Sequence, residues 1–207
     1  MPSDLRRERD RIRSERRRQA VLDAAARVFV RQGFHRTLIS DIAAEAKVGQ
    51  GTFYRHFPDK PAVFRAVFDR FAESLFAGFA GMSARLPRDA REYRDMSVAA
   101  IRELAKGLER NRELALMLLR EAPTVDPALQ ERVDSLHDAF VDLARGYLDH
   151  AVAEGFARPC DTRLVAAAIV GLGVAMAHRW WIGRIPGASL DHMIEELVDL
   201  VFHGLSR

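Results

Sequence analysis

Residues 37–60 read TLISDIAAEAKVGQGTFYRHFPDK, and this stretch decides the fold. Ile42 and Ala43 begin a short apolar stripe at helical spacing, and a Lys-Val-Gly turn follows it. A second short helix is then expected from about Gln50 to Phe57, where a Pro-Asp pair ends it. Two short helices joined by a tight turn predict a helix-turn-helix.

The second of these helices sorts its residues by direction. Phe53 and Phe57 are four positions apart, so both are expected to face the core. The side chains left pointing outward or sideways are Gln50, Thr52, Tyr54, Arg55 and His56. An amide can read a base edge, while hydroxyl, phenol and imidazole groups donate to phosphates. Gly49 and Gly51 remove side chains near the helix start, so backbone N–H groups can approach DNA closely.

The charge distribution points the same way. Residues 1–60 hold 14 basic and 8 acidic residues, a net charge of +6, whereas the rest of the chain nets −3. A basic head of this kind favours a polyanion, either nucleic acid or an anionic membrane surface. Residues 3–18 alone contain eight arginines, and we expect residues 1–16 to form a flexible arm that binding orders.

The order of residues in this stretch resembles the DNA-binding signature of the TetR family of transcriptional regulators. The similarity begins in the first helix at AAARVFVRQGF and includes DIA, GTFYRHF and the Lys that heads the next helix. The resemblance implies a homodimer that places the GTFYRHF helix in the major groove of double-stranded DNA. It implies base-contacting positions at Gln50, Gly51, Thr52 and Tyr54, and phosphate-anchoring positions at Thr37, His56 and Lys60. Arg55 occupies a variable position, and Gly49 stands where a Ser commonly caps the helix.

Strand signals are scarce along the chain, so the sequence predicts an all-α fold. The first helix is expected from about Arg17 to a left-handed glycine cap at Gly33, with Thr37 or Ser40 capping the second. Further helices are expected from Pro61 onward and over 93–110, 112–121, 127–154, 162–182 and 190–205. The predicted organisation is the arm, a DNA-binding domain over 17–62 with its helix-turn-helix at about 38–57, and a ligand-sensing and dimerisation domain over 63–207.

The last two helices carry an apolar and small-residue surface. The family resemblance implies that they form a four-helix bundle with the partner subunit, although packing inside one subunit would also explain the pattern. The residues expected at the dimer interface are Leu164, Ala168, Gly171, Leu172, Ala175, Ile194, Leu197 and Val201. The uncharged run over 164–177 is shorter than the roughly 20 residues that a membrane span needs, so no membrane partner is expected.

The helices of the second domain are expected to enclose a cavity for a small-molecule effector. Its candidate lining residues are Phe68, Phe71, Leu75, Phe79, Met96, Leu104, Leu108, Met117, Phe140 and Tyr147. Taken singly, each of them is more typical of ordinary core packing than of a ligand contact. Their Phe and Met content favours an adaptable, hydrophobic ligand site.

Other functional classes find little support. Histidines at metal-binding spacing, a phosphate-binding glycine loop and a nucleophile with its base are all missing, so no catalytic residue, cofactor or metal is expected. Cys160 is the single cysteine, and the start of the chain lacks the apolar core of a secretory signal, which favours the cytoplasm. The predicted function is a homodimeric repressor released from a pseudo-palindromic operator by a ligand. An activator or a ligand-free architectural DNA-binding protein is the alternative.

Overall fold

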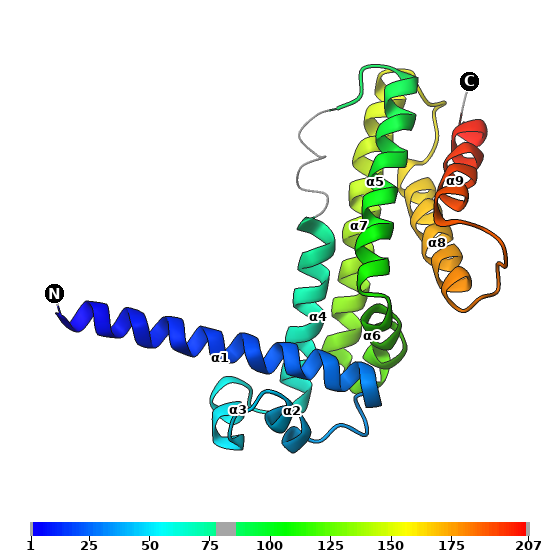
Figure 1. The fold of residues 1–207 in the computed structure, drawn as a ribbon. Coiled ribbons are helices and arrows are strands. Elements are labelled where there is room, and N and C mark those ends of the chain that lie inside the picture. Colours follow the sequence, from blue (N-terminus) through cyan, green and yellow to red (C-terminus); the bar gives the residue numbers. More distant parts are fainter. Residues whose placement is uncertain (1, 78–85, 206–207) are drawn as a thin grey trace. The chain divides into compact units, whose positions relative to one another are not determined.

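The computed structural model describes residues 2–77 and 86–205, with backbone alone at residues 2–4 and 205 (Figure 1). Every regular element in these ranges is α-helical, which confirms the all-α prediction. The chain divides into two compact units. The first combines residues 1–73 with 113–130, and the second combines residues 74–112 with 131–207. The first unit is therefore larger than the DNA-binding domain predicted over residues 17–62.

The first unit holds the helix-turn-helix. Its helices are α1 (Pro2–Gln32), α2 (Ile39–Glu45), α3 (Gln50–His56), the first part of α4 (Lys60–Ala77) and most of α6 (Arg112–Val125). Phe29, Phe34 and Phe64 form an aromatic core in which the Phe64 ring meets each of the other two edge-on, at centroid distances of 5.0 Å. These buried rings join α1, the loop that follows it and α4 into one unit.

The first helix is much longer than expected. The sequence predicted a start near Arg17, whereas α1 begins at Pro2. Arginine and glutamate are good helix formers, and ion pairs between successive turns link Glu8 with Arg11 and Glu15 with Arg18. The arginine-rich segment is thus helical without any hydrophobic core of its own, and its mobility in solution stays a prediction.

The connection from α1 to α2 shows one confirmed and one wrong cap. Gly33 has a φ of 78°, which confirms the left-handed end of α1. The N-cap of α2 is Leu38, so neither Thr37 nor Ser40 caps it. Instead the Asp41 carboxylate accepts the Leu38 N–H at 3.0 Å, because it is placed three residues into the helix.

The second unit contains α5 (Ala90–Arg110), most of α7 (Pro127–Ala153), α8 (Thr162–Trp181) and α9 (Leu190–Leu205). Helices α5 and α9 share a buried cluster of Val98, Ile194 and Val198. An ion pair between Arg94 and Asp199, at 2.6 Å, ties the same two helices. The predicted helix bounds in this unit agree within three residues of those observed.

Helix α8 differs from the other helices in its surface. It is the one helix in the described ranges that is long and apolar enough to cross a membrane by length and composition alone. Only 11% of its apolar window is buried inside the subunit. Its outward side therefore leaves an apolar surface uncovered.

Candidate DNA interface

The short helix α3 is anchored by two phenyl rings. Phe53 is fully buried and Phe57 is 4% exposed, with their ring centroids 6.0 Å apart. Tyr54, the neighbour of Phe53, is 53% exposed. The predicted sorting is confirmed for these residues, because positions four apart share the inner face and the intervening positions point away from it.

The outward set lies together on the surface of α3. Gln50, Gly51 and Arg55 are exposed, while Thr52 and His56 are half-buried. All of them are within seven consecutive residues of one helix, so they form one continuous polar surface. An amide, a hydroxyl, a phenol and a guanidinium on one helix give both donors and acceptors for base edges and donors for phosphates.

The two glycines at the start of α3 have no structural neighbours. Gly49 is the N-cap, with φ −71° and ψ 152°, and provides no side-chain hydrogen bond. A Cβ atom added at Gly49 or Gly51 would meet no heavy atom within 4 Å. Neither backbone conformation nor packing inside the subunit demands glycine here, so both positions leave room for another molecule to approach the backbone closely.

Thr37 does not lie where the sequence placed it. Its side chain is fully buried, and its hydroxyl donates a hydrogen bond to the Gly33 carbonyl at 2.6 Å. A buried hydroxyl that already donates internally is not available to a phosphate. The Thr37 hydroxyl thus closes the loop between α1 and α2, and a phosphate contact at this position stays a prediction.

Lys60 is also engaged inside the subunit. Its ammonium donates to the carbonyl oxygens of Phe34 and Thr37, each at 2.8 Å, and approaches that of His35 at 3.4 Å. It also lies 4.3 Å from the centre of the Phe34 ring. An ammonium has three donors, and these three carbonyls occupy them. Lys60 thus stabilises the loop in this structure, and a phosphate contact at Lys60 stays a prediction.

Helix α6 supports the same loop from the other side. The Glu121 carboxylate accepts the backbone N–H of Phe34, and Thr124 is hydrogen-bonded to the His35 ring at 2.9 Å. A Cβ atom at Gly33 would lie only 2.7 Å from a Glu121 oxygen. Sequence reasoning missed this contact because the partners are 87 and 89 residues apart, a separation that no local pattern reveals.

His56 lies at the end of α3, close to α1. Partial burial of the ring, together with the positive charges of Arg55, Arg18 and Arg17, lowers the pKa of His56 below its ordinary value, and Glu15 opposes this effect. The Arg18 guanidinium also lies 5.4 Å from the centre of the Phe57 ring. His56 is thus surrounded by cations, which favour an anionic partner at this end of α3.

The residues predicted for the dimer interface divide into two groups. Leu164 is 68% exposed, Leu172 is 37% exposed, and Ala168, Gly171 and Ala175 are exposed on the same side of α8. On α9, however, Ile194 is 4% exposed and packs against Val98, while Val201 packs with the Leu148 cluster. Ile194 and Val201 belong mainly to the subunit's own core, and Leu197 is half-buried. Leu200, which is 64% exposed, is the apolar surface residue of α9 that sequence reasoning missed.

The residues predicted to line a ligand cavity are spread over both units. Phe68, Phe71 and Met117 belong to the first unit and are buried. In the second unit Leu75 is buried, and the half-buried members are Met96, Leu104, Leu108, Phe140 and Tyr147. Phe79 lies outside the described residues.

Two hollows are found on the first unit, both open to solvent. One, of about 630 Å³, is lined by α1 residues between Arg11 and Asp23. The other, of about 690 Å³, is lined by α1 and α6, and Met117 is the one predicted ligand residue that it contains. Neither hollow corresponds to the predicted cavity, which therefore stays a prediction.

Comparison with known proteins gives one family match in each half of the chain. The model of bacterial regulatory proteins of the tetR family matches residues 21–67, and the model of the tetracyclin repressor-like C-terminal domain matches residues 98–205. The two matches include the whole helix-turn-helix and all of α8.

Individual relatives are similar along nearly the whole chain. The HTH-type transcriptional activator FasR of Mycolicibacterium smegmatis is 24% identical over 206 residues, which is 100% of this chain and 90% of the relative. The HTH-type transcriptional repressor KstR2 of Rhodococcus jostii is 25% identical over 198 residues, with 92% and 91% covered. A solved structure of a transcriptional regulator from Saccharomonospora viridis in complex with choline has a TM-score of 0.75 and 25% identity, and the alignment covers 92% of this chain and 97% of the other.

Three observations agree on the family of this protein. They are the helix-turn-helix geometry, the outward polar surface of α3, and the two family matches, which together span most of the chain. The protein belongs to the TetR family of DNA-binding transcriptional regulators, with an N-terminal helix-turn-helix domain and a helical C-terminal domain.

Proposed function

We propose that this protein is a cytoplasmic homodimeric repressor that binds a pseudo-palindromic operator and leaves it when a small hydrophobic ligand binds its C-terminal domain. The observation that carries the proposal is the surface of α3, where Gln50 and Tyr54 are exposed beside a buried phenylalanine pair. A rigid helix that offers such groups outward is suited to reading base edges in a major groove.

Dimerisation is supported by the exposed side of α8. Leu164, Ala168, Gly171 and Ala175 recur every three or four residues and therefore form one stripe along the helix. Gly171 and Gly173 have no neighbour within 4 Å of an added Cβ, so a partner helix could approach closely. A second copy of this chain accounts for the uncovered stripe and supplies the second reading helix for a two-fold symmetric site.

Ligand control is supported by the composition of the second unit. Phe76 and Phe140 stack at a centroid distance of 4.8 Å, and half-buried Met and Leu side chains come from α5 and α7. The solved structure of the regulator from Saccharomonospora viridis is a complex with choline, so a protein of similar fold has been found with a small molecule. Our candidate ligand is hydrophobic because the predicted lining residues are Phe, Leu, Met and Tyr.

The proposed mechanism is a shift between two populations of the dimer. In the DNA-competent form, the two α3 helices match half-sites about one turn of DNA apart. A ligand that binds a second form more tightly lowers the population that fits the operator, by no more than its differential affinity for the two forms. We propose that DNA binding by this protein represses transcription. The relative FasR is a transcriptional activator, so similar proteins can also have the opposite effect.

The decisive experiment is selection from a random duplex pool at fixed salt, followed by affinity measurements on the recovered sequence. We expect a pseudo-palindrome. Replacing Gln50 and Tyr54 by Ala should each cost about 1–3 kcal/mol of discrimination against other sequences, while the thermal midpoint stays unchanged, because both side chains are exposed. If the unaltered protein prefers no sequence, the function is refuted.

Gly51→Ala tests close approach to DNA independently. Alanine should not destabilise α3, since the position is open and alanine is the better helix former. Affinity for the selected duplex should nevertheless fall several-fold. An unchanged affinity would show that the open space at Gly51 faces solvent in the complex.

Ligand control is tested by a thermal-shift screen with hydrophobic compounds and with choline as a polar comparison. A compound that raises the thermal midpoint and also releases the selected duplex supports the sensor. A screen in which stabilising compounds leave DNA affinity unchanged would favour a regulator without ligand control.

A further inference from the structure

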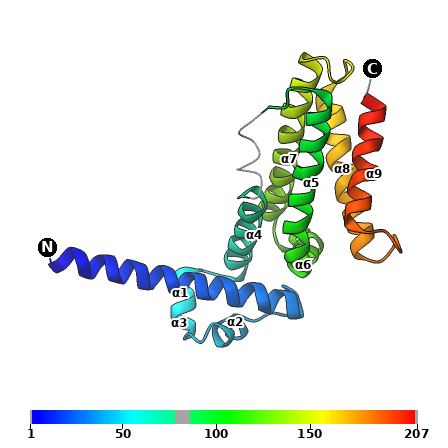
Figure 2. The same ribbon diagram turned by 45° about the horizontal axis from the view of Figure 1, so that its top comes forward.

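The N-terminal half of α1 extends beyond the rest of the first unit. Both views show this helix continuing past α3 toward the N-terminus (Figures 1 and 2). All described side chains from residue 5 to residue 17 are exposed. With a rise of about 1.5 Å per residue, the fifteen residues 2–16 form an arm roughly 22 Å long.

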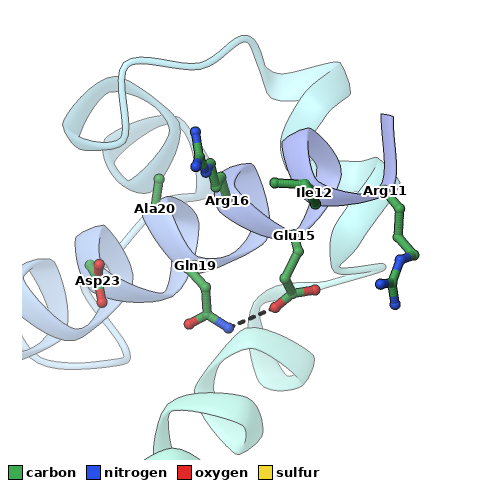
Figure 3. A pocket seen from close by; sticks show the side chains of 7 residues that line it. All are labelled: Arg11, Ile12, Glu15, Arg16, Gln19, Ala20 and Asp23. Atoms are coloured by element: carbon green, nitrogen blue, oxygen red, sulfur yellow. Dashed lines mark hydrogen bonds between the residues drawn. The ribbon is translucent and has the colours of Figure 1, made fainter. Parts of the chain in front are cut away.

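Charge on this arm is sorted by face. The carboxylate-bearing face is directed toward α4, where Asp23 is paired with Arg70 at 2.6 Å and Gln19 approaches the same guanidinium. Glu15 lies on this face and accepts from the Gln19 amide at 2.7 Å, as seen in Figure 3, where both side chains point away from Arg16 and Ala20. Since each residue turns about 100°, Glu8 belongs to the same face.

A different stripe of α1 faces α2 and α3. Val21, Ala24 and Val28 are fully buried in this direction, and Arg31 reaches Glu45 at the end of α2. Stepping back by three and four residues, the stripe continues as Arg17, Asp10, Arg13 and Arg6. Arg17 contributes to the lowered pKa of His56 in α3, which places it beside that helix.

The arginines of this stripe are available to a partner. Arg13 and Arg17 form no ion pair with any residue in the described part of the chain, whereas Arg11 and Arg18 on the other side pair with Glu8 and Glu15. The side of the arm that continues the DNA-reading surface is therefore cationic. On the other faces, Glu8 and Glu15 neutralise Arg11 and Arg18.

We propose that the N-terminal half of α1 is a rigid phosphate-binding arm, which lies across the backbone of the duplex outside the half-site read by α3 and contacts it through Arg6, Arg13 and Arg17. The inference rests on the proposed DNA-binding function and adds a second binding surface to it. A helix is about 10–12 Å wide and the minor groove about 6 Å, so the helical arm binds phosphates rather than entering that groove.

The arm makes no base contact, so its contribution is independent of sequence. Guanidinium groups form charge-assisted hydrogen bonds with phosphate oxygens, and each neutralised phosphate releases counterions. The arm should therefore increase the dependence of affinity on salt, by about 0.9 in the slope of log K against log salt for each phosphate contacted.

The test compares two charge-matched double variants by fluorescence anisotropy on the selected operator at several KCl concentrations. R6Q/R13Q removes two charges from the stripe, and R9Q/R11Q removes two charges from other faces of the same arm. We expect R6Q/R13Q to lower the slope by about 2 per subunit on a duplex with flanking DNA. The same variant should change little on a duplex trimmed to the two half-sites, and R9Q/R11Q should have less than half the effect on either duplex.

Replacing two acidic residues tests for the opposite change, a gain in DNA affinity. Asp10→Asn removes a carboxylate from the stripe and should raise affinity for the flanked duplex, whereas Glu8→Gln, two residues away on the α4 side, should change it much less. Ser14→Pro breaks the helix where nothing packs on it and should abolish the difference between R6Q/R13Q and R9Q/R11Q. A difference that persists in Ser14→Pro would contradict a rigid arm.

Other outcomes distinguish failure of the arm proposal from failure of the proposed DNA-binding function. Equal losses for R6Q/R13Q and R9Q/R11Q, or no loss for either, would overturn the proposal while sequence preference stays intact. If R6Q/R13Q loses binding to vesicles of mixed neutral and anionic lipid while its DNA affinity stays unchanged, the stripe belongs to a membrane-binding surface. This result would also overturn the proposal. Failure of the unaltered protein to prefer any sequence would refute the proposed function itself.

Discussion

At the residue scale, two side chains expected on DNA instead hold the loop between α1 and α2. Thr37 is fully buried against the Gly33 carbonyl, and the Lys60 ammonium is occupied by three carbonyls of the same loop. The loop positions α2 and therefore the start of the reading unit. We expect these residues to influence DNA binding through the geometry of the head.

The Lys60→Met substitution distinguishes a phosphate contact by Lys60 from stabilisation of the loop between α1 and α2. The substitution leaves three carbonyl oxygens without their donor, and we expect it to lower the free energy of unfolding by about 1–3 kcal/mol. Urea denaturation measures the change, with Lys106→Met as the control, because Lys106 forms only an exposed pair with Glu103. Normal stability together with weakened DNA binding would restore the phosphate-anchor interpretation.

His56 should make stability depend on pH. Its pKa in the folded protein is lowered by burial and by Arg55 and Arg18, so the unfolded chain binds more protons between the two pKa values. The stabilising contribution is complete above the ordinary pKa of about 6.5 and is lost as pH falls through the lower, folded-state pKa.

Thermal midpoints from pH 7.5 down to pH 5 should therefore fall more steeply for the unaltered protein than for His56→Gln. The difference is expected to be small, because the ring is only partly buried. Parallel curves for the two proteins would contradict the assignment.

At the element scale, α6 is joined to the DNA-binding head by contacts between residues that are 61 to 89 positions apart in the sequence. Glu121 accepts from Phe34, Thr124 bonds His35, and an ion pair at 2.5 Å links Arg65 of α4 to Asp126 beyond α6. The helix end of α6 thus forms part of the support beneath the helix-turn-helix.

Glu121→Ala should loosen this support. Removing the acceptor leaves the Phe34 N–H unsatisfied in a partly buried site, at a cost of about 1–3 kcal/mol. Glu121→Gln keeps a carbonyl oxygen and should cost less than half as much. Hydrogen exchange of the Phe34 amide reports the change directly, and equal exchange in all three proteins would show that the contact contributes nothing.

The outward side of α8 provides the second prediction at this scale. Replacing Leu164 and Leu172 by Glu places charges in the stripe that a partner subunit would bury, so the dimer should dissociate at micromolar concentration. Sedimentation velocity measures the state, and Leu119→Glu is the control because it is exposed on α6 of the first unit. A monomeric unaltered protein that floats with lipid vesicles would instead assign the stripe to a bilayer.

At the scale of the whole molecule, the proposed DNA-reading surface and the proposed dimer surface lie in different units. The helix-turn-helix belongs to the first unit, and the exposed stripe of α8 belongs to the second. Specific binding by a dimer therefore requires that the separation of two heads match the separation of two half-sites.

Insertion of five base pairs between the half-sites of the selected operator tests this requirement. The insertion rotates one half-site by about half a turn of DNA, so only one head can bind in register. Affinity should fall to that of a single half-site, as measured by anisotropy at constant salt. Unchanged affinity would mean that each head binds independently.

Local pattern was sufficient for much of the protein. The apolar repeat of three and four residues, the break at Pro58 and the glycine at position 33 determined the all-α class, the helix-turn-helix and the outward direction of Gln50 and Tyr54. These features depend on neighbours within about one or two helical turns, so the sequence carries them directly.

Tertiary structure decided the roles of residues whose partners are distant in the chain. Lys60 could be a phosphate ligand or a carbonyl donor, and only the folded loop 26 residues before it shows that its donors are used. Ile194 repeats like an interface residue but is buried against Val98 on α5, and Glu121 meets Phe34 across 87 residues. Periodicity identifies an apolar face, yet only the three-dimensional arrangement determines which surface covers that face, because burial is a property of the neighbours rather than of the residue.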